Sequence, residues 1–425
     1  MLCPQFQNEI QFFDNLGADI IRPLIKMRKN NMSLNNTPSG ERIHIGFFGR
    51  RNAGKSSLVN AVTGQELSVV SDVKGTTTDP VYKAMELLPL GAIEIIDTPG
   101  YDDEGMLGEL RVKKTRQILA KTDIAVLVVD ISAEIGDCEN ELMELFKERE
   151  IPYIIVYNKA DLGGREINSP NEIIVSAKDK RNIHQLKEKI GELAEKTGDE
   201  RQIIGDLLNA GDVVVLVTPI DESAPKGRMI LPQVQTLRDI LDSDAIAVFS
   251  KPEQLSDTLE KLSAPPRIVV TDSQVFGTVS KIVPESIPLT SFSILMARYK
   301  GFFETAVKGA AAIDSLDDGA KILISEGCTH HRQCGDIGSV KLPNMLKKYT
   351  GKNFEIILTS GRDFPEDLTE YSLVIHCGGC MLNEKEMAYR RRLAEMQGVP
   401  FTNYGTALAK FSGILSRSIE PFDTI

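Results

Sequence analysis

Two short segments near the carboxyl end of the chain contain side chains that bind metals. The first is CTHHRQC at positions 328–334, and the second is HCGGC at positions 376–380. A Cys-x-x-Cys pair is a frequent ligand pair for zinc or iron, and the two intervening glycines allow the backbone to turn tightly around a bulky centre. The residues alone leave two interpretations open, an iron-sulfur site or a closed zinc site with three thiolates and one imidazole.

A second group of residues that could bind a ligand or take part in a reaction lies near the amino end. The segment GRRNAGKSS follows the apolar run RIHIGFF and matches the P-loop pattern GxxxxGKS/T. In such a loop the glycines let backbone amides surround phosphate oxygens, the lysine reaches the outer phosphates, and the serine can bind magnesium. The expected phosphate-binding residues are Gly49, Asn52, Ala53, Gly54, Lys55, Ser56 and Ser57.

Two further motifs at predicted strand ends extend this nucleotide site. The run AIEIIDTPG places Asp97 where a carboxylate can hold magnesium through water, and Gly100 where a backbone amide can sense the terminal phosphate. The run IPYIIVY leads into Asn158, Lys159 and Asp161. The Asp161 carboxylate can accept two hydrogen bonds from guanine, whereas adenine lacks the 2-amino group and would leave the carboxylate unpaired.

A last loop completes the predicted guanine site. The run IIVSAK supplies Ser176, Ala177 and Lys178, and places the Ala177 amide near the guanine carbonyl. Because these signals occur in the right order, the sequence predicts GTP as the ligand.

The elements that position these residues read as alternating strands and helices. A length of 425 residues suggests about three domains at roughly 150 residues each. After the nucleotide motifs, the runs DVVVLVTPI, AIAVFS and RIVVTDSQVF predict a small parallel α/β layer, and AKILISE, FEIILTS and YSLVIH predict another. Loops beyond the carboxyl ends of parallel strands converge, so the two cysteine segments can share one site.

Composition limits the class of protein and its surroundings. The apolar content of 42% is ordinary for a globular chain, and no run approaches the roughly 20 apolar residues of a membrane span. The net charge of −11 disfavours nucleic acid as a partner. Six cysteines are too few for a disulfide scaffold, so metal binding in a reducing cytoplasm is expected. We assign no role to Cys3 or Cys138.

Residues 41–195 resemble the translation-factor-like GTPases. The resemblance implies GTP hydrolysis, with Thr76 and Thr77 in a switch segment and Thr77 as a magnesium ligand beside Ser56. Asn52 looks like the asparagine with which one subgroup binds potassium, which would neutralise charge in the transition state; the alternative is that it only shapes the loop. Tyr101 stands where much of the superfamily has a water-orienting glutamine, so slow turnover is expected.

From Met32 to the carboxyl end, the chain resembles the [FeFe]-hydrogenase maturation GTPases. The resemblance rests on a P-loop GTPase followed by an α/β segment and CxH…HCxxC. It implies that three cysteines hold a [4Fe-4S] cluster and that the protein carries a di-iron precursor cluster to apo [FeFe]-hydrogenase. It further implies radical-SAM hydrogenase maturases as partners and a homodimer. The positions that match the family's metal-binding pattern are Cys328, His330, His376, Cys377 and Cys380.

The fourth ligand of this cluster stays open. It can be exchangeable, or it can be His330, His376, Cys334 or a carboxylate such as Asp336. The expected architecture is a leader over 1–40 whose natural start can be Met32, a P-loop GTPase domain over 41–198, a middle α/β interaction or dimerisation domain over 199–285, and an α/β iron-sulfur domain over 286–425.

Two other functions are weighed against this one. The first is a GTPase with a structural zinc domain that acts in RNA modification or ribosome assembly, which the acidic charge and the absence of a basic tail disfavour. The second is a non-enzymatic protein in which GTP is a static ligand.

Overall fold

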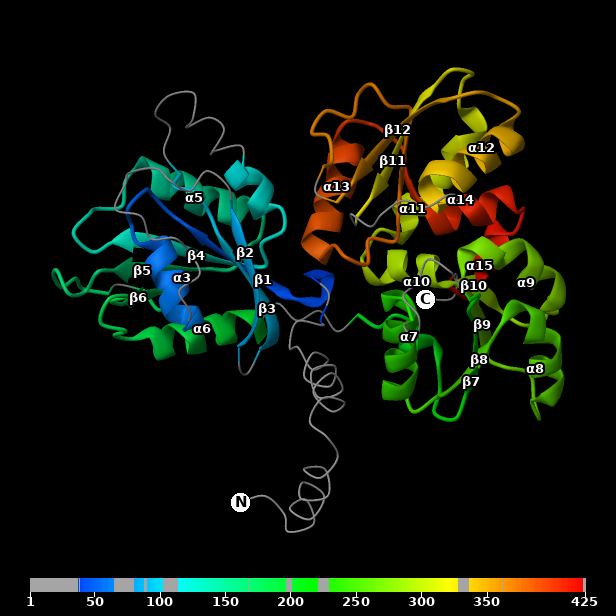
Figure 1. The fold of residues 1–425 in the computed structure, drawn as a ribbon, viewed down its shortest axis with the longest axis horizontal. Coiled ribbons are helices and arrows are strands. Elements are labelled where there is room, and N and C mark those ends of the chain that lie inside the picture. Colours follow the sequence, from blue (N-terminus) through cyan, green and yellow to red (C-terminus); the bar gives the residue numbers. More distant parts are fainter. Residues whose placement is uncertain are drawn as a thin grey trace, which may run out of the picture.

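Three open β-sheets follow one another along the chain, and helices flank each sheet (Figure 1). This arrangement confirms the predicted α/β class. The protein is seen here as a computed structural model that describes residues 37, 39–64, 80–87, 90–101, 114–167, 169–195, 201–220, 229–327, 336–361 and 363–422.

The first sheet has the order β2-β3-β1-β4-β5-β6, and only β2 runs antiparallel to its neighbour. Its strands β1, β3, β4 and β5 are almost wholly buried, because helices cover both faces of a parallel sheet. The chain reverses its strand order at β1, which creates a crevice at the carboxyl ends of the strands. The elements are β1 (Ile43–Phe48), α3 (Lys55–Thr63), β2 (Val81–Leu87), β3 (Gly91–Asp97), β4 (Ile124–Asp130), α5 (Asp137–Glu148), β5 (Tyr153–Asn158), β6 (Glu172–Ile174) and α6 (Ile183–Glu195).

The second sheet is parallel throughout, with the order β10-β9-β7-β8. The strands β7, β9 and β10 form its buried part, whereas β8 lies at an edge and exposes several side chains. The elements are β7 (Val213–Val217), α7 (Leu231–Asp242), β8 (Ile246–Ser250), α8 (Leu255–Lys261), β9 (Ile268–Thr271), α9 (Phe276–Ile282), β10 (Leu289–Ser291) and α10 (Phe292–Tyr299).

The third sheet is also parallel, with the order β12-β11-β13-β14. Strands β11 and β13 are direct neighbours, so the segments that follow them start at the same edge of the sheet. The elements are α11 (Phe303–Ala311), β11 (Lys321–Glu326), α12 (Leu342–Thr350), β12 (Glu355–Ser360), β13 (Leu373–His376), α13 (Glu384–Met396), β14 (Phe401–Asn403), α14 (Tyr404–Phe411) and α15 (Leu415–Ile419).

The middle sheet extends beyond the boundary expected at residue 285. Strand β10 lies after that position, yet it pairs with β9 through Leu289 opposite Val269. The sequence signal was weak because β10 has only three residues. In the other direction, α15 returns from the third domain to β10, where the Thr290 hydroxyl donates to the Ser418 carbonyl over 2.9 Å.

None of the helices in the described ranges is both long enough and apolar enough to cross a membrane.

Candidate nucleotide and metal sites

The phosphate loop adopts the backbone conformation that its glycines predict. Gly49 and Gly54 have φ values of 136° and 89°, which favour glycine. A Cβ atom on Gly49 would lie 2.2 Å from the carbonyl oxygen of Val128, so a side chain there would collide with β4. Helix α3 begins directly after Gly54, and its free amides and positive end face the loop. The loop can therefore receive an anionic group.

Lys55, Ser56 and Asp97 lie close to one another at the phosphate loop. The Lys55 ammonium is buried and donates to the carbonyl oxygens of Gly49 and Arg50 over 2.9 and 2.8 Å. The Ser56 hydroxyl donates to the Asp97 carboxylate over 2.6 Å, although 41 residues separate them. The predicted magnesium-binding serine and carboxylate thus meet at one point of the loop.

The guanine end of the site is organised around Asn158, at the end of β5. Its amide nitrogen donates to the carbonyl of Ala53 over 3.2 Å, and its amide oxygen accepts from the Ala177 backbone over 3.1 Å. The Ser176 hydroxyl donates to Asp161 over 3.0 Å, and this bond lowers the pKa of the carboxyl. Asp161 is therefore an ionised acceptor, as pairing with guanine requires.

Lys159 and Lys178 flank this pair of loops. Lys159 has a φ of 68° and its ammonium lies 2.6 Å from Asp130. Lys178 lies 3.7 Å from the Asp161 carboxylate.

The residue at the position that often carries a water-orienting glutamine points toward helix α5. Tyr101 is buried, and its hydroxyl donates to Glu141 on α5 over 2.6 Å. Gly100 packs against the phosphate loop, because a Cβ atom there would lie 2.8 Å from the Arg51 nitrogen. Ser57 is half-buried in the first turn of α3. The predicted switch residues Thr76 and Thr77 lie outside the described residues.

The HCGGC segment forms a tight loop after β13, which we call the metal loop (residues 377–382). The Cys377 sulfur accepts backbone N–H groups from Gly327 over 3.0 Å and from Gly379 over 3.3 Å. Gly379 has a φ of 63°, which lets the backbone turn back toward the sulfur. Burial raises the pKa of the Cys377 thiol to about 11, and burial also raises the pKa of Cys380.

Part of the predicted metal site can be located and part cannot. Gly327, which contacts Cys377, is the residue before Cys328 in the chain. Cys328, His330, His331 and Cys334 lie outside the described residues. Asp336 accepts from the Ser339 backbone nitrogen over 2.9 Å. Among the described residues, no three or more His, Cys, Asp or Glu side chains are grouped so that they could hold a metal ion.

His376 is fully buried and both of its ring nitrogens have partners. Nδ1 lies 2.8 Å from the Cys377 carbonyl oxygen, and Nε2 accepts from the Arg390 guanidinium over 3.0 Å. Burial and the positive charge of Arg390 lower the pKa of His376 to about 3, so the ring is neutral. Ligation by His376 remains a prediction, and it would require one of these contacts to break.

Two buried cations that sequence reasoning missed support the metal loop. Arg390 on α13 donates to Glu386 over 2.6 Å, to the Gly361 carbonyl over 2.7 Å and to His376. Lys300, after α10, donates to the carbonyls of Gly379 and Leu382. Burial lowers the pKa of Lys300, and the nearby thiols act in the opposite direction. Neither cation belongs to a motif, so local spacing could not indicate it.

Three family models match consecutive parts of this chain. Residues 44–159 match the 50S ribosome-binding GTPase model, residues 203–301 match the Hydrogen maturase F dimerization domain, and residues 304–421 match the Hydrogen maturase F tetramerization domain.

Individual relatives match just under half of this chain. GTPase Der of Wolinella succinogenes is 32% identical over 219 residues, which are 47% of this chain and 46% of that protein. GTPase Era of Heliobacterium modesticaldum is 29% identical over 229 residues, which are 45% of this chain and 76% of that protein. The chain thus spans about half the length of the Der relative.

Solved structures of GTPases give weaker likenesses. Era of Aquifex aeolicus is 16% identical with a TM-score of 0.32, and covers 75% of this chain and 94% of its own. Elongation factor SelB of Methanococcus maripaludis is 21% identical with a TM-score of 0.31, and covers 39% of this chain and 36% of its own. TM-scores this low do not show that the whole chains share a fold.

The phosphate loop, the Ser56 and Asp97 pair and the Asn158 loop define this protein as a P-loop GTPase, which confirms the predicted class of enzyme. With the two Hydrogen maturase F domains that follow, the chain belongs to the Hydrogen maturase F family of hydrogenase maturation GTPases.

We expect Arg390→Ala to lower the free energy of unfolding by about 3–5 kcal/mol, because it removes the cation that hydrogen-bonds buried Glu386 and leaves only Lys121, 4.0 Å away. The Arg390 and Glu386 side chains are 2% and 11% exposed. Urea denaturation followed by circular dichroism would measure the loss. Arg238 is a matched control, since it pairs with Asp242 at the same four-residue spacing on an exposed surface. Arg238→Ala should stay close to the parent, and equal midpoints for both variants would contradict the prediction.

Proposed function

We propose that this chain is a GTP-hydrolysing scaffold that binds a [4Fe-4S] cluster, receives a di-iron cofactor precursor and delivers it to apo [FeFe]-hydrogenase. GTP turnover would regulate contacts with the radical-SAM hydrogenase maturases. Membership of the Hydrogen maturase F family supports this proposal. The observation that carries it is the metal loop, in which two backbone N–H groups point at the Cys377 sulfur.

The described donors fit an iron-sulfur cluster. Cys377 and Cys380 are free thiols, and N–H groups directed at a sulfur stabilise the thiolate that cluster binding requires. Cys328 would supply the third thiolate, and His330 or His376 would lie near the remaining position. When bound, the cluster would supply an iron centre for the di-iron precursor, and its fourth ligand stays open. The free thiols support a reducing compartment, which we propose is the cytoplasm.

The double variant Cys377→Ser, Cys380→Ser should lose its iron and sulfide after anaerobic purification and should fail to activate apo-hydrogenase. GTP hydrolysis should stay near the parent rate, because the thiols and the nucleotide loops lie in different domains. Cys138→Ser on α5 is the control and should keep its iron. Full iron in the double variant would refute the cluster assignment. Zinc in place of iron in the parent would favour a structural zinc domain.

Magnesium in the nucleotide site would be held by Ser56 and Thr77, with Asp97 acting through water. We further propose a potassium ion beside Asn52. This residue is exposed and has a φ of 63°, which only glycine, asparagine and aspartate adopt readily. The left-handed backbone leaves its side chain available to a cation at the edge of the loop.

Potassium should accelerate GTP hydrolysis where sodium does not, and Asn52→Gly should abolish the difference. Glycine keeps the left-handed backbone and removes the side chain with its amide oxygen, so nucleotide binding should persist. Steady-state phosphate release in matched potassium and sodium chloride would measure both rates. Equal hydrolysis rates of the parent enzyme in the two salts would mean that Asn52 only shapes the loop.

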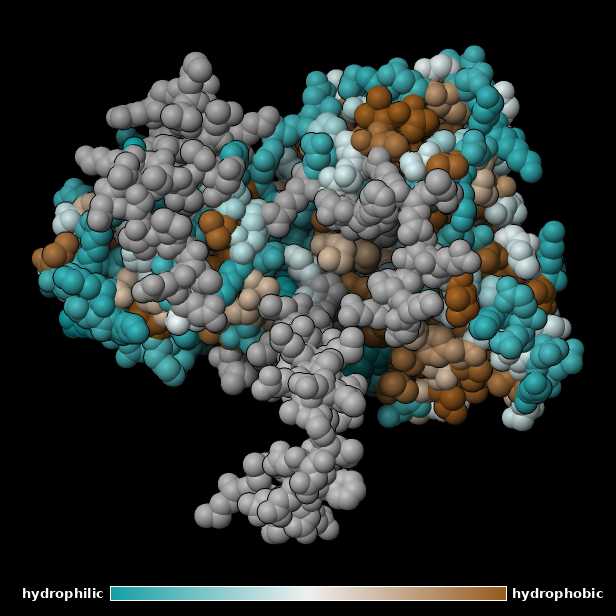
Figure 2. Space-filling view, viewed as in Figure 1, coloured by the Kyte–Doolittle hydropathy of each residue, from teal (hydrophilic) through white to brown (hydrophobic). Residues whose placement is uncertain are grey.

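We also propose that the edge strand β8 pairs with a second copy of this chain. In the order of the middle sheet, β8 lies at an edge and therefore has a strand neighbour on one side only. Ile246 and Phe249 on β8 are 51% and 39% exposed, and Leu241 on the adjacent α7 is 54% exposed. Figure 2 shows apolar side chains gathered over this part of the middle domain. A second copy would cover this edge, and the matched dimerization-domain model supports that occupant.

Ile246→Lys should shift the protein toward a lower oligomeric state, because it places a charge in the proposed contact. Sedimentation velocity over a range of concentrations would measure the distribution. Ile167→Lys is the matched control, since Ile167 is 49% exposed on the GTPase domain. The edge assignment would be wrong if both variants sedimented like the parent.

A further inference from the structure

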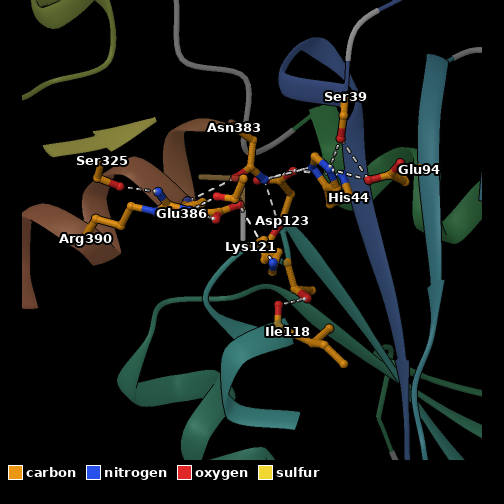
Figure 3. A network of polar contacts seen from close by, with 12 residues as sticks. Ser39, His44, Glu94, Ile118, Lys121, Asp123, Ser325, Asn383, Glu386 and Arg390 are labelled. Atoms are coloured by element: carbon orange, nitrogen blue, oxygen red, sulfur yellow. Dashed lines mark hydrogen bonds and ion pairs between the residues drawn. The ribbon is translucent and has the colours of Figure 1, made fainter. Parts of the chain in front are cut away.

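A buried polar joint connects the GTPase domain to the residue that follows the metal loop (Figure 3). The Asn383 amide nitrogen lies 2.8 Å from His44 Nδ1 on β1, 2.7 Å from the Lys121 carbonyl oxygen and 3.3 Å from Asp123. Asn383 is only 5% exposed. All three partners belong to the GTPase domain, although more than 250 residues separate them from Asn383.

Asn383 has a second role at the start of α13. Its amide oxygen accepts the Glu386 backbone nitrogen over 3.0 Å, which caps the helix. The capping contact fixes which end of the amide faces the GTPase domain, so the nitrogen is the donor there. One side chain therefore joins the helix that carries Arg390 to the strand that carries the phosphate loop.

Gly40, in the turn that leads into the GTPase domain at β1, lies in direct contact with the metal loop. It lies in the short helical turn Ser39–Glu41 before β1. A Cβ atom on Gly40 would lie 2.6 Å from the Cys380 carbonyl oxygen and 2.8 Å from that of Leu382. Both atoms belong to the backbone, so they could not move aside without displacing the loop.

The loop needs such support because of its own composition. Gly378 and Gly379 give its backbone wide conformational freedom. From the middle domain, Lys300, directly after α10, donates to the carbonyls of Gly379 and Leu382. Gly40 closes the loop from the GTPase side, at Cys380 and Leu382.

We propose that Gly40 and Asn383 are positioning residues through which the GTPase domain holds the metal loop in its closed conformation. This inference rests on the proposed function. A cluster held by the loop would be shielded when the two domains dock and exposed when they separate. The geometry itself requires no metal.

The test is the rate at which N-ethylmaleimide alkylates Cys377 and Cys380 in the full-length, chelator-treated protein, followed by peptide mass spectrometry. Asn383→Asp keeps an oxygen for the α13 cap but loses the donor and faces the Asp123 carboxylate. Gly40→Ala adds the single methyl group that collides with the loop. We expect both variants to raise the two rates about tenfold, which corresponds to the loss of about 1.4 kcal/mol in joint stability.

Matched control variants distinguish loss of the joint from a general loss of stability. Asn171→Asp changes an exposed asparagine, and Gly277→Ala adds a methyl group where no atom lies within 4 Å. Both should alkylate like the parent. Cys138 serves as an internal reference, and its rate and GTP hydrolysis should not change in any variant.

Two outcomes overturn the inference: parent-like alkylation of both thiols in Asn383→Asp, or a rise that Cys138 shares. Should Gly40→Ala fail to fold, Asn383→Asp alone decides. Iron content of the parent is measured separately. A parent without iron but with faster alkylation in the variants would refute the proposed function and leave the joint intact. A parent with iron and unchanged alkylation would refute the joint alone.

Discussion

The buried guanidinium of Arg390 ties the third domain together. It donates to Glu386 on its own helix, to His376 at the end of β13, and to the Gly361 carbonyl beyond β12. Removing such a charge from water is costly, and the cost is offset only because several partners surround it. Since Arg390 fixes α13 against the sheet, it also fixes Asn383 at the start of α13 and His376 beside the metal loop.

In the first and third sheets, the candidate binding loops occupy equivalent positions. The phosphate loop follows β1 and the metal loop follows β13, each at the carboxyl end of a parallel strand. The joint, however, uses the opposite end of the first sheet, since His44 lies near the start of β1 and Asp123 precedes β4. The nucleotide edge therefore points away from the metal loop, and no side chain need serve both sites.

The sequence predicted the parts of these sites that depend on local spacing. Gly49, Lys55, Asn158 and Asp161 sit at strand ends within short motifs, and the structure brings them to one edge. Asn383 was beyond prediction because its partners are more than 250 residues away. The middle boundary was misplaced for a related reason, since β10 is recognisable only by its pairing with β9.

The free energy of the joint limits how far GTP could change the conformation of the metal loop. The Asn383 amide nitrogen has two hydrogens to donate among its three partners, and each hydrogen bond contributes roughly 0.5–1.5 kcal/mol, so the joint is worth about 1–3 kcal/mol. Coupling free energies between two ligand sites are typically about 1–3 kcal/mol. The two ranges overlap, so nucleotide exchange at one end of β1 is energetically sufficient to open a contact at the other. A rigid apolar interface of the same extent would be too strong for this, which gives a physical reason for a polar joint at this position.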